Sequence, residues 1–183
     1  MKELATFAAE AGLASPGLAP SSRLSELAKL AEIRDGVRLR PTVLVVEDNP
    51  EDRDLIAWAF EECAGRVDLH WVEDGEQALE YLAGCCTGAN GAGRPRPALV
   101  ILDLDLPKLG GVETLQAMRA DLALRTIPVV VFTGSGESRD ITRCYELGAN
   151  SYFTKPISME GYRTVIRMLE TYWLRKVELP PFP

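Results

Sequence analysis

Hydrophobic positions follow two alternating patterns from Thr42 onward. Short runs rich in β-branched residues alternate with longer segments in which apolar residues recur at helical spacing. This order is typical of βαβ units around a parallel sheet. Three of the runs are apolar at every position, as expected of strands that are buried on both faces. The predicted strands are Val43 to Val46, Val67 to Val72, Ala98 to Leu102, Pro128 to Phe132 and Ser151 to Phe153.

Five helices are predicted between and after these strands. The first begins with Asn49 as a cap and Pro50 at the first helical position, and Gly148 is a C-terminal stop for the fourth. Right-handed crossovers would place helices on both faces of the sheet, which gives a doubly wound α/β fold. The stretch from Gly84 to Pro97 is rich in Gly and Pro and is predicted to be a surface loop. The helical segments are 49–65, 74–84, 111–124, 138–149 and 160–179.

The first 40 residues differ from the rest of the chain. Two helix-like apolar patches flank the segment "SPGLAPSS". We therefore divide the chain into an N-terminal extension, residues 1–40, that is either helical or disordered, and a main domain, residues 41–183. The alternatives for the extension are partner-binding helices, a loosely attached segment, or a start codon assigned too far upstream.

Composition narrows the class of protein. The 183 residues are 46% hydrophobic, enough for one main core, and the net charge of −7 argues against a nucleic-acid-binding surface. The cysteines lack the spacing of a zinc site and are interpreted as free thiols, with a strained Cys85–Cys86 disulfide as the alternative. No apolar run approaches the roughly 20 residues of a membrane span. The N-terminus has no signal-peptide pattern, so we expect a cytoplasmic protein without membrane contact.

Chemically reactive side chains stand at the ends of four predicted strands. Glu47 and Asp48 end the first strand, Asp103 ends the third, and Thr133 and Lys155 follow the fourth and fifth. Ligands of open parallel sheets bind beyond these carboxyl ends. Any one of these residues alone could be a helix cap. Several converging carboxylates, however, repel one another, and a hard cation such as Mg²⁺ relieves this repulsion. Lys155 and Thr133 suit a phosphoryl group, which a facing carboxylate can accept as an acyl phosphate.

This pattern, an acidic pair, a strand-end Asp, a strand-end Thr and Lys-Pro, resembles the receiver domain of two-component response regulators. The resemblance implies a flavodoxin-like five-stranded parallel sheet of order 2-1-3-4-5. It also implies roles for individual residues. Asp103 would be the phosphoacceptor and, with Asp48 and the backbone carbonyl of Asp105, a Mg²⁺ ligand, while Glu47 would act through water. Thr133 would bind the phosphoryl oxygen, Lys155 would pair with Asp103, Phe153 would be the aromatic switch, and Pro156 would follow a cis peptide bond.

A narrower resemblance concerns "VVEDNPEDRDLIAWAF", "ELGANSYFTKPIS" and "LETYWLRKVELPP". These segments are similar to single-domain regulators that partner phytochrome-type sensor histidine kinases. The similarity implies a kinase partner and a homodimer built from the fourth helix, the fifth strand, the last helix and the tail. Tyr172, Trp173 and Leu174 are consecutive, so they cannot all point inward from one helix, although Trp173 could fold back onto the sheet. The N-terminal extension and the acidic Asp105 depart from the usual receiver pattern.

Three other functions agree less well with the sequence. A haloacid-dehalogenase-like phosphatase shares the Asp103-Leu-Asp105 motif, but it places that motif on its first strand and an acidic pair after the lysine. A degenerate receiver that serves only as a scaffold would lack a key residue, and none is missing. A DNA-binding output would need a further domain after the last helix. We therefore expect a protein that catalyses only its own phosphorylation and dephosphorylation.

Overall fold

The computed structural model describes residues 40–62, 67–86 and 94–180, all within one compact unit that begins at Arg40. Of the predicted extension, only Arg40 is among the described residues, so the division of the chain at residue 40 stays a prediction. Five parallel strands form one sheet in the order β2-β1-β3-β4-β5. The predicted fold class and strand order are confirmed.

The strands agree closely with the apolar runs of the sequence. Every residue of β1, β3 and β4 is buried, as their uninterrupted apolar character predicts. The register pairs Val46 of β1 with Leu102 of β3, so the residues that follow, Glu47 and Asp103, emerge side by side. The bounds are β1 Thr42–Val46, β2 Asp68–Val72, β3 Leu99–Leu102, β4 Val129–Thr133 and β5 Ser151–Thr154.

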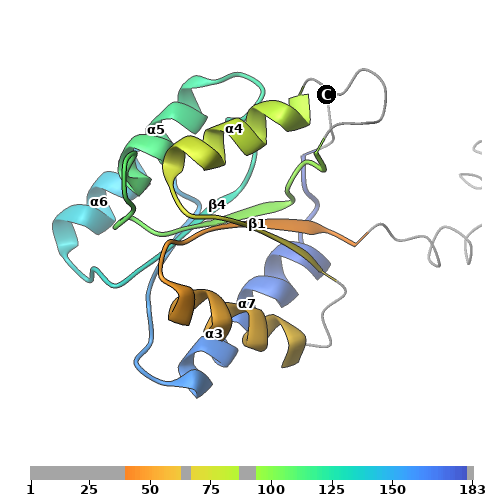
Figure 1. Ribbon diagram of the computed structural model, residues 1–183, viewed down its shortest axis with the longest axis vertical. Coiled ribbons are helices and arrows are strands. Elements are labelled where there is room, and N and C mark those ends of the chain that lie inside the picture. The colour runs from red at the N-terminus through yellow and green to blue at the C-terminus, as the bar shows by residue number, and fades with distance from the viewer. Residues whose placement is uncertain (1–39, 63–66, 87–93, 181–183) are drawn as a thin grey trace, which may run out of the picture. The chain divides into compact units, whose positions relative to one another are not determined.

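Helices cover both faces of the sheet (Figure 1). One layer consists of α4 (Gly75–Cys86), α5 (Gly111–Ala120) and α6 (Ser138–Glu146), and the other of α3 (Pro50–Glu62) and α7 (Met159–Arg175). Each layer has its own apolar core. Alternate residues of the central strands enter one core or the other, because neighbouring side chains of a strand point to opposite faces.

Local hydrogen bonds and one glycine conformation explain where α3 begins and where α5 and α6 end. Asn49 accepts a hydrogen bond from the Glu51 amide at 2.9 Å and caps α3, with Pro50 as its first residue. Gly148 has a φ of 95°, the left-handed conformation that suits a residue just after a helix. The prediction for α5 was too long by one turn. Asp121 accepts a hydrogen bond from the Ala123 amide at 2.7 Å, and this local turn replaces further helix.

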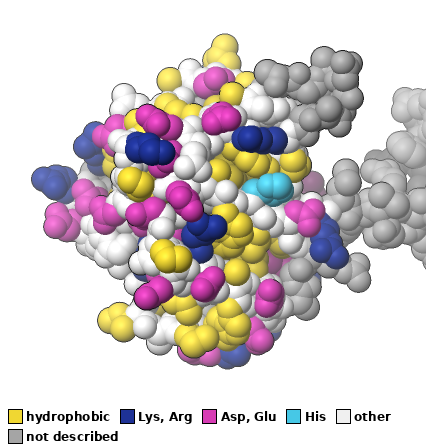
Figure 2. All heavy atoms as spheres, in the orientation of Figure 1, with side chains coloured by type: hydrophobic (Ala, Val, Ile, Leu, Met, Phe, Trp, Pro, Cys, Tyr) yellow, Lys and Arg dark blue, Asp and Glu magenta, His cyan; other side chains and the backbone are white. Residues whose placement is uncertain are grey.

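The surface carries mixed charge. On the face drawn in Figure 2, basic side chains are separated by acidic and neutral ones, and no continuous basic area forms there. Among the helices of the described residues, none has the length and apolar character that a bilayer crossing requires.

Candidate functional site

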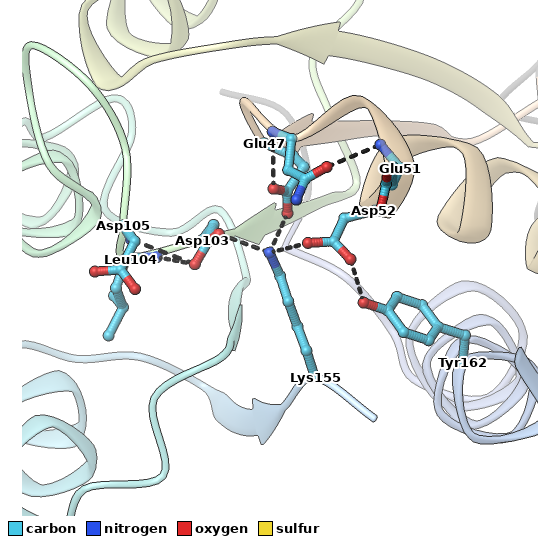
Figure 3. Close-up of polar contacts among 9 residues, drawn as sticks. Glu47, Glu51, Asp52, Asp103, Leu104, Asp105, Lys155 and Tyr162 are labelled. Carbon is cyan, nitrogen blue, oxygen red and sulfur yellow. Dashed lines mark hydrogen bonds and ion pairs between the residues drawn. The ribbon is translucent and has the colours of Figure 1, made fainter. Parts of the chain in front are cut away.

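Lys155 lies at the centre of an acidic cluster at the carboxyl ends of the strands (Figure 3). Its Nζ is 2.7 Å from Glu47 Oε2, 2.7 Å from Asp103 Oδ2 and 2.8 Å from Asp52 Oδ2. The lysine side chain is 11% exposed and those of Glu47 and Asp103 are even less exposed. Charge-assisted hydrogen bonds in such a shielded place are stronger than surface ion pairs. The predicted contact between Lys155 and Asp103 is therefore present.

Asp103 is held in a fixed orientation by the backbone that follows it. Its Oδ1 accepts hydrogen bonds from the Leu104 amide at 2.6 Å and from the Asp105 amide at 3.3 Å. Its own amide donates to Val46 O at 3.0 Å, which joins it to the end of β1. The carboxylate thus has one oxygen on backbone amides and the other on Lys155.

Three carboxylates form a group that could hold a metal ion. The side-chain oxygens of Glu47, Asp48 and Asp103 lie within 4.8 Å of one another, and Asp48 is the exposed member. Burial raises the pKa of Glu47 to about 7, although the neighbouring Lys155 opposes the shift. Burial lowers the pKa of Lys155, but its hydrogen bonds to Asp103, Asp52 and Glu47 outweigh this effect and leave it above the usual value. The acids outnumber the one lysine, and an all-oxygen group with excess negative charge fits a hard divalent cation.

Thr133 brings an unpartnered hydroxyl to the end of β4. The residue is fully buried, and its Oγ1 has no hydrogen-bond partner among the described residues. A buried polar group without a partner costs about 1–3 kcal/mol, so such an atom calls for an explanation. The Thr133 carbonyl is used, because it accepts from the Lys155 amide at 2.7 Å. The hydroxyl is therefore available to a ligand with an acceptor oxygen.

The predicted switch residue is wrong, because Phe153 lies on the opposite face of the sheet from Thr133. Phe153 pairs with Phe132, and both belong to the α3 and α7 core. Tyr152 pairs with Val131, which has the same side-chain direction as Thr133, and packs against the other core. The Tyr152 hydroxyl donates to Ser135 O at 2.9 Å, two residues beyond Thr133. Tyr152 is thus the aromatic side chain on the Thr133 side.

The predicted cis peptide bond before Pro156 is also wrong. The Lys155–Pro156 bond is trans, and no cis bond occurs among the described residues. Lys155 reaches the site with this trans bond. Its amide donates to Thr133 O of β4, and its Nζ binds Asp103 Oδ2.

Two members of the cluster, Asp52 and Tyr162, were not predicted. Asp52 lies in the first turn of α3, and its Oδ1 accepts a hydrogen bond from the Tyr162 hydroxyl of α7. Burial, followed by the bond to Asp52, raises the pKa of Tyr162, which keeps the phenol protonated as a donor. The sequence indicates where each residue lies in its own helix, because α3 starts at the strand edge and Tyr162 lies one helical turn before the buried Ile166, but it does not indicate that the two residues meet at Lys155.

The chain is similar in sequence to a known family and to several of its members. Residues 43–167 match the response regulator receiver domain family. The probable methanogenesis regulatory protein FilR2 of Methanothrix harundinacea is 40% identical over 132 residues, which cover 72% of this chain and 83% of FilR2. Response regulator Rcp1 of Synechocystis is 34% identical over 138 residues, 75% of this chain and 92% of Rcp1.

Solved structures show the same fold. The phosphorylated cyanobacterial phytochrome response regulator RcpA superimposes with a TM-score of 0.70 and 34% identity, covering 78% of this chain and 99% of RcpA. The Mn²⁺-bound form of Rcp1 gives a TM-score of 0.68 and 33% identity, covering 77% of this chain and 99% of that one.

Proposed function

Because the chain belongs to the response regulator receiver family, we propose that it is a single-domain regulator that accepts a phosphoryl group on Asp103. One observation carries the proposal. Asp103 is gathered with Glu47 and Asp48 into one carboxylate group while Lys155 binds its Oδ2. A shielded carboxylate with a fixed orientation, a cation beside it and a free hydroxyl nearby is equipped to receive a phosphoryl group and to hold it.

We propose Mg²⁺ as the metal at this site, with the carboxylates of Asp48 and Asp103 and the carbonyl of Asp105 as ligands and Glu47 acting through water. The all-oxygen donor set supports a hard cation, and the similar protein Rcp1 has been crystallised with Mn²⁺, which accepts the same ligands. When bound, the ion would neutralise negative charge on the transferring phosphoryl oxygens.

The side chains divide the reaction between them. An Asp103 carboxylate oxygen attacks the phosphorus of a phosphohistidine, the P–N bond breaks, and the imidazole leaves with the bonding electron pair. The product is an aspartyl phosphate. Lys155 offsets the added negative charge, and the Thr133 hydroxyl donates to a phosphoryl oxygen. Water later attacks the same phosphorus and releases phosphate, so the protein acts only on its own phosphoryl group.

We propose that Thr133 and Tyr152 form the switch. Thr133 moves toward the phosphoryl oxygen, and the space behind it becomes accessible to Tyr152 on the same face of the sheet. Tyr152 can then give up its bond to Ser135 O. The equilibrium between the two arrangements shifts only as far as the phosphoryl group binds one better than the other.

A phytochrome-type sensor histidine kinase is the proposed phosphodonor, and the cytoplasm the proposed location. The similarity to RcpA, a phytochrome response regulator, supports this choice of kinase.

We also propose a homodimer formed by α6, β5, α7 and the tail. Met168 and Tyr172 leave large exposed apolar surfaces on α7, and exposed apolar surface of this kind often marks a contact between proteins.

Phosphotransfer tests the choice of donor. A phytochrome-type kinase labelled with radioactive phosphate should transfer the label to the wild-type protein within minutes, in a reaction that a chelator abolishes. A kinase of another sensor class serves as the control. Equal or faster labelling by the control kinase would contradict the proposed partner.

A further inference from the structure

One carboxylate partner of Lys155 lies outside the acidic group proposed to bind the metal. That group consists of Glu47, Asp48 and Asp103. Asp52 is the additional partner, 2.8 Å from Nζ and 18% exposed at its side chain. An ammonium group has three protons to donate, and the contacts to Glu47, Asp103 and Asp52 match that number. The phosphorylation chemistry explains two of these contacts and leaves the contact with Asp52 unexplained.

Asp52 is itself fixed by the last helix. Its Oδ2 accepts from Lys155, and its Oδ1 accepts from the Tyr162 hydroxyl of α7 (Figure 3). Tyr162 is 2% exposed, and its ring packs edge-on against Phe132 of β4, with 5.4 Å between the centroids. Both oxygens of Asp52 are therefore occupied by donors from different elements, and the phenol that holds one of them has little freedom to move.

We propose that Asp52 is a positioning residue for Lys155 and that, through Tyr162, it couples α7 to the occupant that Lys155 binds. The inference rests on the proposed phosphorylation of Asp103. When a phosphoryl oxygen replaces the Asp103 carboxylate as the acceptor, Nζ moves with it. The Lys155–Asp52 contact draws Asp52 along, and the hydrogen bond from Tyr162 to Asp52 changes with it. Helix α7 transmits the change to its outer face, where Met168 and Tyr172 are exposed.

The experiment removes the link without removing the ring. Tyr162→Phe deletes the hydroxyl that binds Asp52 and preserves the packing on Phe132. Tyr81→Phe is the matched control, because Tyr81, in α4 of the other helical layer, is also buried and its hydroxyl donates at 3.0 Å to Pro95 O. Acetyl phosphate with Mg²⁺ and intact mass measure phosphorylation of each protein, and thermal melting verifies the fold. Beryllofluoride, a stable stand-in for the phosphoryl group, is then added for amide NMR of α7.

In wild type and Tyr81→Phe, beryllofluoride should shift the α7 amides around Ile166, and in Tyr162→Phe these shifts should be lost. Asp52→Asn is a second variant, in which the Lys155 ammonium signal should broaden as its protons exchange faster. Failure of the wild type to gain a phosphoryl group would overturn the proposed function and this inference with it. Two results would overturn the inference alone. The first is normal phosphorylation of Tyr162→Phe with beryllofluoride-induced α7 shifts as large as those of wild type. The second is a Lys155 ammonium signal in Asp52→Asn that is as sharp as in wild type.

Discussion

Lys108 and Asp74 form an ion pair beside the segment that carries Asp105. Asp74 is buried, and its Oδ1 accepts a hydrogen bond from the Gln77 amide at 2.8 Å at the start of α4. Lys108 has a φ of 59°, an uncommon conformation for a residue other than glycine. The hydrogen bond from Lys108, followed by that from the Gln77 amide, lowers the pKa of Asp74. The pair thus fixes the loop after β3 to the first turn of α4.

Lys108→Met should lower the free energy of unfolding at neutral pH, and the loss should shrink in acid. A carboxyl whose pKa is lowered by folding stabilises the protein above its unfolded pKa, here near 3.8, and loses that contribution as the pH falls through its lower folded pKa. Urea unfolding between about pH 3 and about pH 7 measures the difference from wild type. Lys176→Met, at an exposed position, is the control. A Lys108→Met penalty that stays constant across this range would contradict the assignment.

The strand-end residues of the site could be predicted from sequence, whereas their neighbours from helices could not. Glu47, Asp103 and Lys155 directly follow or end strands, and parallel topology alone brings such positions together. Asp52 and Tyr162 depend on how α3 packs on α7, which no local pattern specifies. The error at Phe153 is one of parity, because a shift of one residue in a strand reverses the face.

The start of α5 packs directly on the end of β3. A Cβ added to Gly111 would lie 2.0 Å from the backbone oxygen of Asp103, a distance that backbone atoms cannot relieve without moving. The Gly111 amide also donates to Leu104 O at 3.0 Å. A side chain at this position would therefore displace the loop that orients the Asp103 carboxylate.

Gly111→Ala should lower the free energy of unfolding by about 1–3 kcal/mol, the usual cost of overpacking, and should weaken Mg²⁺ binding. Gly136→Ala is the matched control, because its nearest neighbour, Thr154 Oγ1, would be at an ordinary 3.7 Å. Urea unfolding gives the stability, and titration calorimetry gives the affinity for Mg²⁺. Equal effects of the two substitutions would show that the contact with Asp103 is unimportant.

Helices and strands as elements were predictable where side-chain periodicity decides them, and less so at their ends. The apolar run predicts β4, but it places the last residue, Thr133, after the strand rather than in it. The last helix ends at Arg175, before the predicted residue 179. The ends depend on single hydrogen bonds, such as that from the Lys176 amide to Tyr172 O at 3.2 Å, which apolar spacing does not reveal.

Helix α7 and strand β5 line a groove of about 760 Å³, and its walls include Phe153, Met168 and Tyr172. Trp173 and Leu174 pack partly against the α3 and α7 core, so the alternative of an inward Trp173 holds, while Tyr172 is 57% exposed. Deleting the tail from Tyr172 onward would therefore also damage the core. A substitution at Tyr172 tests the proposed dimer more cleanly.

Tyr172→Glu should shift the proposed dimer toward monomer, because a carboxylate buried in an apolar interface without a partner is costly. Light scattering across a dilution series measures the mass of the full chain. Leu122→Glu is the control, since Leu122 is 74% exposed and follows α5, outside the proposed interface. A wild-type protein that remains monomeric at tens of micromolar, with and without phosphorylation, would contradict the dimer.

Phosphorylation of Asp103 is tested most directly by intact mass after incubation with acetyl phosphate. Wild type with Mg²⁺ should gain one phosphoryl group, and wild type with a chelator should gain none. Asp103→Asn with Mg²⁺ should also gain none, whereas Asp105→Asn, the same change two residues away, should still gain one. A phosphoryl adduct on Asp103→Asn equal to that on wild type, or an adduct in chelator equal to that in Mg²⁺, would contradict Asp103 as the metal-dependent phosphoacceptor.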